Sequence, residues 1–168
     1  TLPREHHIST EVCPQHLVLT SPECYEHLGT KAQMNPPIRS KRHTVALWQA
    51  LKDGIIDCIA TDHAPHTLAE KKQPYGMSPS GMPGVETSLA LMLDRVNRDL
   101  CTLPEVVYWM SESPAKLYKM HGKGRIEVGQ DADLALIDMS LKKKVTNGKL
   151  HTRVNWSPFD GMELQGWP

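Results

Sequence analysis

The sequence predicts an α/β fold with parallel strand pairing, and three observations support this. Segments typical of strands alternate with segments typical of helices along most of the chain. The run Ile55–Ala60 is apolar throughout, as in a strand that a parallel sheet buries on both faces. The polar motif Thr61–His66 follows that run directly, and α/β folds place their sites at the carboxyl ends of strands.

The first half of the chain supplies one strand and one or two helices before this run. Residues 8–13 form the first predicted strand, because β-branched side chains favour extended backbone, and Pro14 closes it. Ser21-Pro22-Glu23 offers a helix start, since serine is a good cap and proline is tolerated at the first position. The two prolines of residues 35–39 exclude a helix there.

A second helix is predicted from Thr44, and the long polar loop comes after the apolar strand. Val45, Trp48 and Leu51 recur at helical spacing, and Gly54 supplies a stop. Residues 66–84 are rich in Pro, Gly, Ser and Lys and show no period, so we expect a long functional loop.

The second half of the chain is predicted to begin with helices and to end in a small β region. The apolar positions of residues 85–96 mark one face of an amphipathic helix, a shorter helix covers 103–110, and Ser113-Pro114 opens a third with a serine cap. Residues 132–138 read as a strand, and the last thirty residues show no clear helix. Trp48 and Trp109 are expected to pack in the core, and Lys142–Lys144 to form a solvated turn.

Composition excludes several classes of protein. In 168 residues, 19 Lys and Arg balance 19 Asp and Glu, so no net field recruits nucleic acid or an anionic membrane. No apolar run approaches the length of about 20 residues that spans a bilayer. Four cysteines without a CxxC pair indicate reduced thiols in a cytoplasmic protein. The chain starts without Met, and we expect it to be a piece of something longer.

The motif Thr61–His66 (TDHAPH) carries the strongest chemical signal. One carboxylate and two imidazoles offer metal ligation, general base chemistry and anion binding within a few residues. Pro65 excludes a regular helix through the motif. The alternative is an aspartate that caps a helix, beside two surface histidines.

TDHAPH after an apolar strand resembles the signature of the dihydroorotases, on the eighth strand of an amidohydrolase barrel. Further segments resemble this family in the family's order. They are EVCPQHL at 11–17, QMNPPIR at 33–39, SGMPGVE at 80–86, GRIEVGQDADL at 124–134 and WSPFDG at 156–161. The resemblance therefore covers nearly the whole chain. Hydantoinases and allantoinases share the barrel, but the pair of TDHAPH and MNPP favours dihydroorotase.

The resemblance implies roles for particular residues. Asp62 would ligate a metal ion, zinc in one or two copies, and would carry the proton between the attacking hydroxide and the leaving amide nitrogen. A bound metal lowers the pKa of water to about 7. Asn35 and His66 would hold the substrate carboxylate and ring, and backbone near Ser80 and Gly81 would close over it. His63 would support Asp62.

The family pattern is incomplete in this sequence. No H-x-H pair is present, although the family holds its metals with such a pair and further histidines. His7 in His7-Ile8-Ser9-Thr10 resembles a metal-binding histidine of the family. If His7 is that ligand, a unit of about two dozen residues that the family has before EVxPxHL is missing here. The alternative is that the segment is only the lead-in to the seventh strand, and we favour it because it needs no deletion.

The resemblance predicts a part of a barrel. A (β/α)8 barrel needs about 250 residues, so we expect residues 1–121 to be the C-terminal portion of the amidohydrolase barrel and 122–168 a segment of the flanking β domain. Dihydroorotate or carbamoyl-aspartate would be the substrate, and the isolated chain would be weakly active or inactive. A second copy or the missing N-terminal part would be its partner. A hydantoinase-like enzyme and a non-catalytic dihydroorotase-like protein remain the alternatives.

Overall fold

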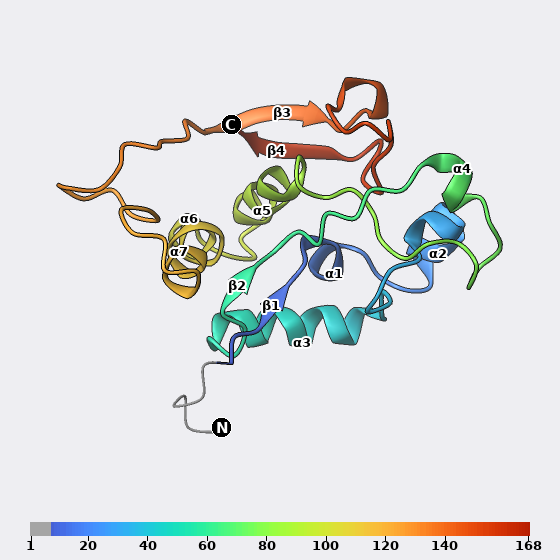
Figure 1. The fold of residues 1–168 in the computed structure, drawn as a ribbon, viewed down its shortest axis with the longest axis horizontal. Helices are drawn as coiled ribbons and strands as arrows, with labels where there is room; N and C mark the ends of the chain where they lie inside the picture. The colour runs from blue at the N-terminus through green and yellow to red at the C-terminus, as the bar shows by residue number, and fades with distance from the viewer. Residues whose placement is uncertain (1–7) are drawn as a thin grey trace.

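The computed structural model describes residues 8–168, and the first two of the three predicted strands pair in parallel (Figure 1). Strand β1 (Glu11–Val12) lies beside β2 (Cys58–Ile59), with Val12 opposite Ile59. Just beyond the strands, the Ala60 amide donates to the Val12 carbonyl over 3.1 Å. Parallel pairing is therefore confirmed, although each strand is shorter than predicted.

Helices fill the connection between these strands. They are α1 (Pro14–Val18), α2 (Glu23–Leu28), the 3-10 turn η1 (Gly29–Ala32) and α3 (Lys41–Lys52). Pro14 opens α1 as well as closing the strand, because the first helical position needs no N–H. α3 begins earlier than Thr44, after Ser40 in extended conformation. Residues 35–39 lie outside any helix, as predicted.

One helical turn interrupts the predicted loop. Helix α4 (Leu68–Lys71) starts at a capping box, in which the Thr67 hydroxyl accepts from the Glu70 amide and the Glu70 carboxylate accepts from the Thr67 amide. This turn corrects the prediction of an irregular loop from 66 to 84. The T-x-x-E spacing is the sequence signal for it.

The helices after the loop are α5 (Ser88–Asn97), α6 (Leu103–Val107), the π-helical turn η2 (Tyr108–Glu112) and α7 (Ser113–Leu117). The last three follow without a break, so Ser113 lies inside a helical run. Its hydroxyl donates to the Asp57 carbonyl over 2.6 Å. The predicted serine cap is therefore wrong, because Ser113 ties the helix to the start of β2 instead.

The tail is an antiparallel ribbon of β3 (Asp138–Lys144) and β4 (Glu163–Trp167), joined through a 3-10 turn, η3 (Asn147–Lys149). The predicted strand at 132–138 and the predicted turn at Lys142–Lys144 are both wrong. Leu134 and Leu136 are 64% and 89% exposed, whereas the lysines pair with β4. The position of β3 is therefore set by its pairing with β4 and not by the local apolarity of the sequence.

Helix α5 lies between two hydrophobic clusters. Leu91 packs with Trp156, Phe159 and Leu164 of the tail, beneath the ribbon in Figure 1. Met92 packs instead with the cluster of β1, β2 and α6. That cluster contains Trp109, whose ring lies 6.3 Å from that of Trp48, which confirms their predicted packing. In residues 8–168 no helix is long and apolar enough to cross a membrane.

Candidate active site

The end of β2 presents Asp62 at an open surface. Asp62 has φ 43°, a left-handed conformation that aspartate tolerates better than most residues. The backbone of Thr61, the residue before Asp62, is fixed by a hydrogen bond. Buried Gln15 donates through Nε2 to the Thr61 carbonyl over 3.1 Å. The side chain of Asp62 is exposed. The strand end therefore fixes the backbone and leaves the carboxylate accessible.

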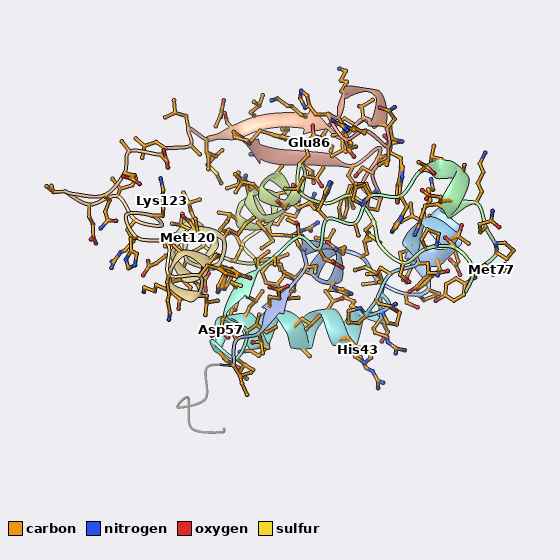
Figure 2. The ribbon with its side chains drawn as sticks, in the orientation of Figure 1. His43, Asp57, Met77, Glu86, Met120 and Lys123 are labelled. Atoms are coloured by element: carbon orange, nitrogen blue, oxygen red, sulfur yellow. The ribbon has the colours of Figure 1, made fainter. Side chains whose placement is uncertain are left out.

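A cavity of about 680 Å³ lies at the carboxyl ends of the two parallel strands. Asp62 and Asn35 both line it, so the structure brings these two predicted residues together. Helix α3 forms one wall, and Figure 2 labels His43 near the start of that helix. The other polar lining residues are Glu11, Cys13, His16, Arg39 and Thr44.

Glu11 and Cys13 are site residues that the sequence did not single out. Burial raises the pKa of the Cys13 thiol to about 12, and the negative charges of Asp62 and Glu11 raise it as well. Cys13 therefore stays a neutral thiol at physiological pH. The Glu11 and Asp62 carboxylates therefore both contribute negative charge to the lining of this cavity.

Asn35 and His66, two of the predicted site residues, both contact a third, Ser80, in the loop. The Asn35 Nδ2 group donates to the Ser80 hydroxyl over 3.2 Å. The His66 Nε2 atom lies 3.1 Å from the Ser80 carbonyl, so it carries the proton in this contact, since a carbonyl only accepts. His66, Ser80 and Gly81 do not line the cavity of Asp62. Asn35 belongs to both groups and connects them.

Gly81 is required by close contact as well as by conformation. Its φ is +123°, and an added Cβ would lie 2.6 Å from the Ala64 Cβ. The same Cβ would lie 3.5 Å from the His66 Nε2 atom. A side chain here would therefore push the loop away from the TDHAPH segment.

Buried Trp156 of the tail fixes the backbone of His66 through a hydrogen bond. The Trp156 indole donates to the His66 carbonyl over 2.7 Å, and its side chain is 1% exposed. The tail is therefore part of the framework of the site. WSPFDG was a motif in the sequence, but its contact with TDHAPH could not be predicted from spacing.

The His63 ring contacts the end of the loop. Its Nδ1 atom accepts from the amides of Gly84 and Val85, over 3.1 and 3.3 Å. It lines a separate cavity of about 450 Å³, together with Glu86 and His151, which form an ion pair over 2.9 Å when His151 is protonated. Figure 2 labels Glu86 at the β3–β4 ribbon. Among residues 8–168 no hydrogen bond joins His63 to Asp62 as the predicted support would require, and the two bonds to His63 order the end of the loop.

The described residues do not make a complete metal centre. Within residues 8–168 no three His, Cys, Asp or Glu side chains are grouped so that they could hold a metal ion. His7, the other predicted ligand, lies outside the described residues. Asp62 is exposed at a strand end and has the donor type for one ligand position.

Residues 2–165 match the amidohydrolase family, and the chain belongs to that family. Its sequence is similar to the dihydroorotase of Methanosarcina mazei, at 39% identity over 162 residues, covering 95% of this chain and 35% of the relative. It is also similar to the dihydroorotase of Halobacterium salinarum, at 42% identity over 151 residues, covering 90% of this chain and 36% of the relative. The resemblance to dihydroorotases is thus confirmed.

Solved structures of related hydrolases share the fold. The L-hydantoinase (dihydropyrimidinase) of Arthrobacter aurescens superposes with a TM-score of 0.90 at 35% identity, covering 95% of this chain and 36% of that one. The dihydropyrimidinase of Brevibacillus agri superposes with a TM-score of 0.86 at 30% identity, covering 94% of this chain and 36% of that one. The chain thus spans about a third of the length of the relatives it matches.

Proposed function

We propose that this chain is the C-terminal portion of a dihydroorotase. Residues 1–121 would contribute the last part of a (β/α)8 barrel and residues 122–168 a segment of the flanking β domain. The assembled enzyme would interconvert carbamoyl-aspartate and dihydroorotate for pyrimidine biosynthesis. The parallel pair β1–β2, the separate ribbon β3–β4 and the similarity to dihydroorotases support this division. Four free cysteines are consistent with the cytoplasm.

The observation that carries the proposal is the double role of Asn35. It lines the cavity of Asp62 and also bonds to Ser80 in the loop. Substrate bound between them would contact Asp62 on one side and the loop on the other. Asn35 and His66 would hold the carboxylate and the polar ring atoms, and backbone at Ser80 and Gly81 would close over the ring. Arg39 adds a cation to the same cavity, which suits a carboxylated ring.

Asp62 would perform the proton transfers of the reaction. Its carboxylate would take a proton from the attacking water as the new C–O bond forms at the ring carbonyl. It would then give that proton to the ring nitrogen as the C–N bond breaks. One or two zinc ions would supply a more acidic water when bound. Because residues 8–168 offer too few ligands, other parts of the assembled enzyme would have to complete that centre.

A hydantoinase-type activity is the alternative, because the solved structures that superpose well carry those names. The dihydroorotase reading is favoured by the higher identity to dihydroorotases, 39% and 42% against 35% for the Arthrobacter enzyme. The guanidinium of Arg39, which lines the same cavity as Asn35, also favours a ring that bears a carboxylate. Both activities belong to one class of cyclic-amide hydrolase.

A chimera tests the proposal directly. The third of the Methanosarcina mazei dihydroorotase that this chain matches would be replaced by the chain, and the isolated chain would be assayed in parallel. We expect dihydroorotate hydrolysis by the zinc-loaded chimera and little or none by the isolated chain. Hydrolysis of hydantoin or dihydrouracil in place of dihydroorotate would favour the alternative. A folded, metal-loaded chimera without any activity would contradict the proposal.

A further inference from the structure

Lys71 is buried beneath the loop that contains Ser80 and Gly81. It ends helix α4 and is 1% exposed, while its neighbour Lys72 is exposed. Lysine is among the residues least often buried, because removing an ammonium from water is costly unless it is paired. No carboxylate of the described residues forms a salt bridge with Lys71. Its position therefore needs another explanation.

Backbone carbonyls satisfy the ammonium of Lys71. Its Nζ atom donates to the carbonyl of Gln33 over 2.9 Å, of Pro79 over 2.8 Å and of Gly81 over 3.0 Å. An ammonium has three N–H donors, so three acceptors saturate it, whereas a neutral amine could serve only two of them. Burial lowers the pKa of this lysine, but the geometry matches its charged form.

The three carbonyls belong to residues next to or near Asn35 and Ser80 in the sequence, which the proposed substrate would contact. Gln33 precedes Asn35 by two positions, and Pro79 and Gly81 flank Ser80 in the chain. The Gly81 amide also donates to the Gln33 carbonyl over 3.0 Å. One ammonium thus holds together the two segments from which the Asn35–Ser80 hydrogen bond arises.

The side chain of Gln33 extends this network into the outer part of the loop. The Gly76 amide donates to its Oε1 atom over 2.9 Å, and its Nε2 group donates to the Ser78 carbonyl. Gln33 and Ser78 are 8% and 3% exposed. In contrast, Met77 at the outer edge of the loop is 74% exposed (Figure 2). The loop is therefore tied from its inner side.

We propose that Lys71 is a positioning residue, which builds the loop from 66 to 84 as a preformed wall of the site. An apolar side chain of similar length would fill the same space, so packing alone does not call for a charge. The charge is explained by the need to gather three carbonyls at one point. The identity of the ligand at this wall rests on the proposed function, but the order of the loop does not.

Nuclear magnetic resonance and hydrogen exchange on the 168-residue chain test this role. Lys71→Met keeps the length and removes the donors, and Lys72→Met is the matched control on the same helix. We expect one slowly exchanging lysine ammonium in the wild-type spectrum, absent only from Lys71→Met. The amides of Gly76 and Gly81 should exchange about tenfold faster or more in Lys71→Met and unchanged in Lys72→Met. Unchanged exchange in folded Lys71→Met would overturn the proposal.

A pH series on the wild-type chain serves if Lys71→Met does not fold. Lys71 should lose its proton at lower pH than the exposed lysines, and the side-chain amide signal of Asn35 should move in the same pH range. The titratable groups of the surrounding segments, which must be assigned as well, are Tyr25, Lys31, His66, Glu70, Lys72 and Tyr75. Titration of Lys71 together with the other lysines, or without any shift at Asn35, would count against the role.

Dihydroorotate added to the wild-type chain forms a separate arm of the experiment. Slower exchange of Gly81 on addition of the compound would support both proposals together. If the ammonium signal and the effect of Lys71→Met are present but the folded, zinc-loaded chimera does not hydrolyse dihydroorotate, the proposed substrate is wrong and the positioning role stands.

Discussion

The side-chain amide of Asn35 donates to the hydroxyl of Ser80 over 3.2 Å, across 45 positions of sequence. This hydrogen bond is one of several that join the segment before α3 to the loop after α4. Both side chains keep contact with solvent, so the bond competes with water. The main effect of the bond is to orient the side-chain amide of Asn35, which also lines the cavity of Asp62.

A double-mutant cycle measures this bond. We expect Asn35→Ala and Ser80→Ala to be coupled by about 0.5–1.5 kcal/mol, in the range of a neutral hydrogen bond. Urea unfolding of the two single variants and the double variant gives the coupling free energy. Asn35→Ala combined with Lys72→Ala is the control and should be additive. Additivity in the first pair as well would show that the bond is not formed in solution.

Gly81→Ala should destabilise the chain more than Gly76→Ala. Both glycines have positive φ, +123° and +90°, so each substitution brings a strain of about 1–3 kcal/mol. An alanine at 81 also meets the Ala64 Cβ at 2.6 Å, whereas position 76 has nothing within 4 Å. We expect about 1–3 kcal/mol of additional loss from overpacking at 81. If urea unfolding shows equal losses of stability in the two variants, the close contact between positions 81 and 64 has no energetic role.

The local features of the fold were predictable where short-range chemistry decides them. The parallel pairing of the run before Asp62 followed from its apolarity on both faces, and the exclusion of helix at 35–39 followed from its prolines. Helix α4 was missed although its Thr67 and Glu70 carry the spacing of a capping box. The strand β3 was misplaced, because its lysines acquire a partner only through pairing with β4.

The candidate site was predictable from motifs, but its support was not. TDHAPH and MNPP predicted Asp62, Asn35 and His66; the structure places Asp62 and Asn35 at one cavity, whereas His66 lies outside its lining. Lys71 and Trp156 support these residues through backbone carbonyls. A contact to a carbonyl leaves no pattern of residue types in sequence, so only the tertiary structure reveals it.

Asp62→Asn should remove the proposed chemistry without unfolding the protein. Asparagine matches aspartate in shape and also tolerates the left-handed backbone at φ 43°. We expect a change of less than about 0.5 kcal/mol in the free energy of unfolding, and a loss of about 10²–10⁴ in kcat of the chimera. Asp99→Asn is the matched control, since Asp99 is exposed and has φ 58°. Full activity in Asp62→Asn would dismiss Asp62 as the base.

Cys101 should make the stability of the chain depend on pH in the alkaline range. Burial raises the pKa of its thiol to about 11 from an ordinary value of 9.0, and the charge of Glu105 adds to the shift. The unfolded chain therefore loses this proton at lower pH than the folded chain does. The stability linked to Cys101 is fully present below pH 9.0 and is lost as pH rises toward about 11.

Comparison of the wild type with Cys101→Ala isolates this contribution, because the lysines and other thiols titrate in both proteins. Urea unfolding at several pH values between 8 and 11 gives the difference in stability, with pH 8 as the reference for lost packing. We expect that difference to shrink by roughly 2–3 kcal/mol across the range, from a shift of about two pKa units. A difference that stays constant would mean that the thiol of Cys101 ionises in the folded chain as readily as in water.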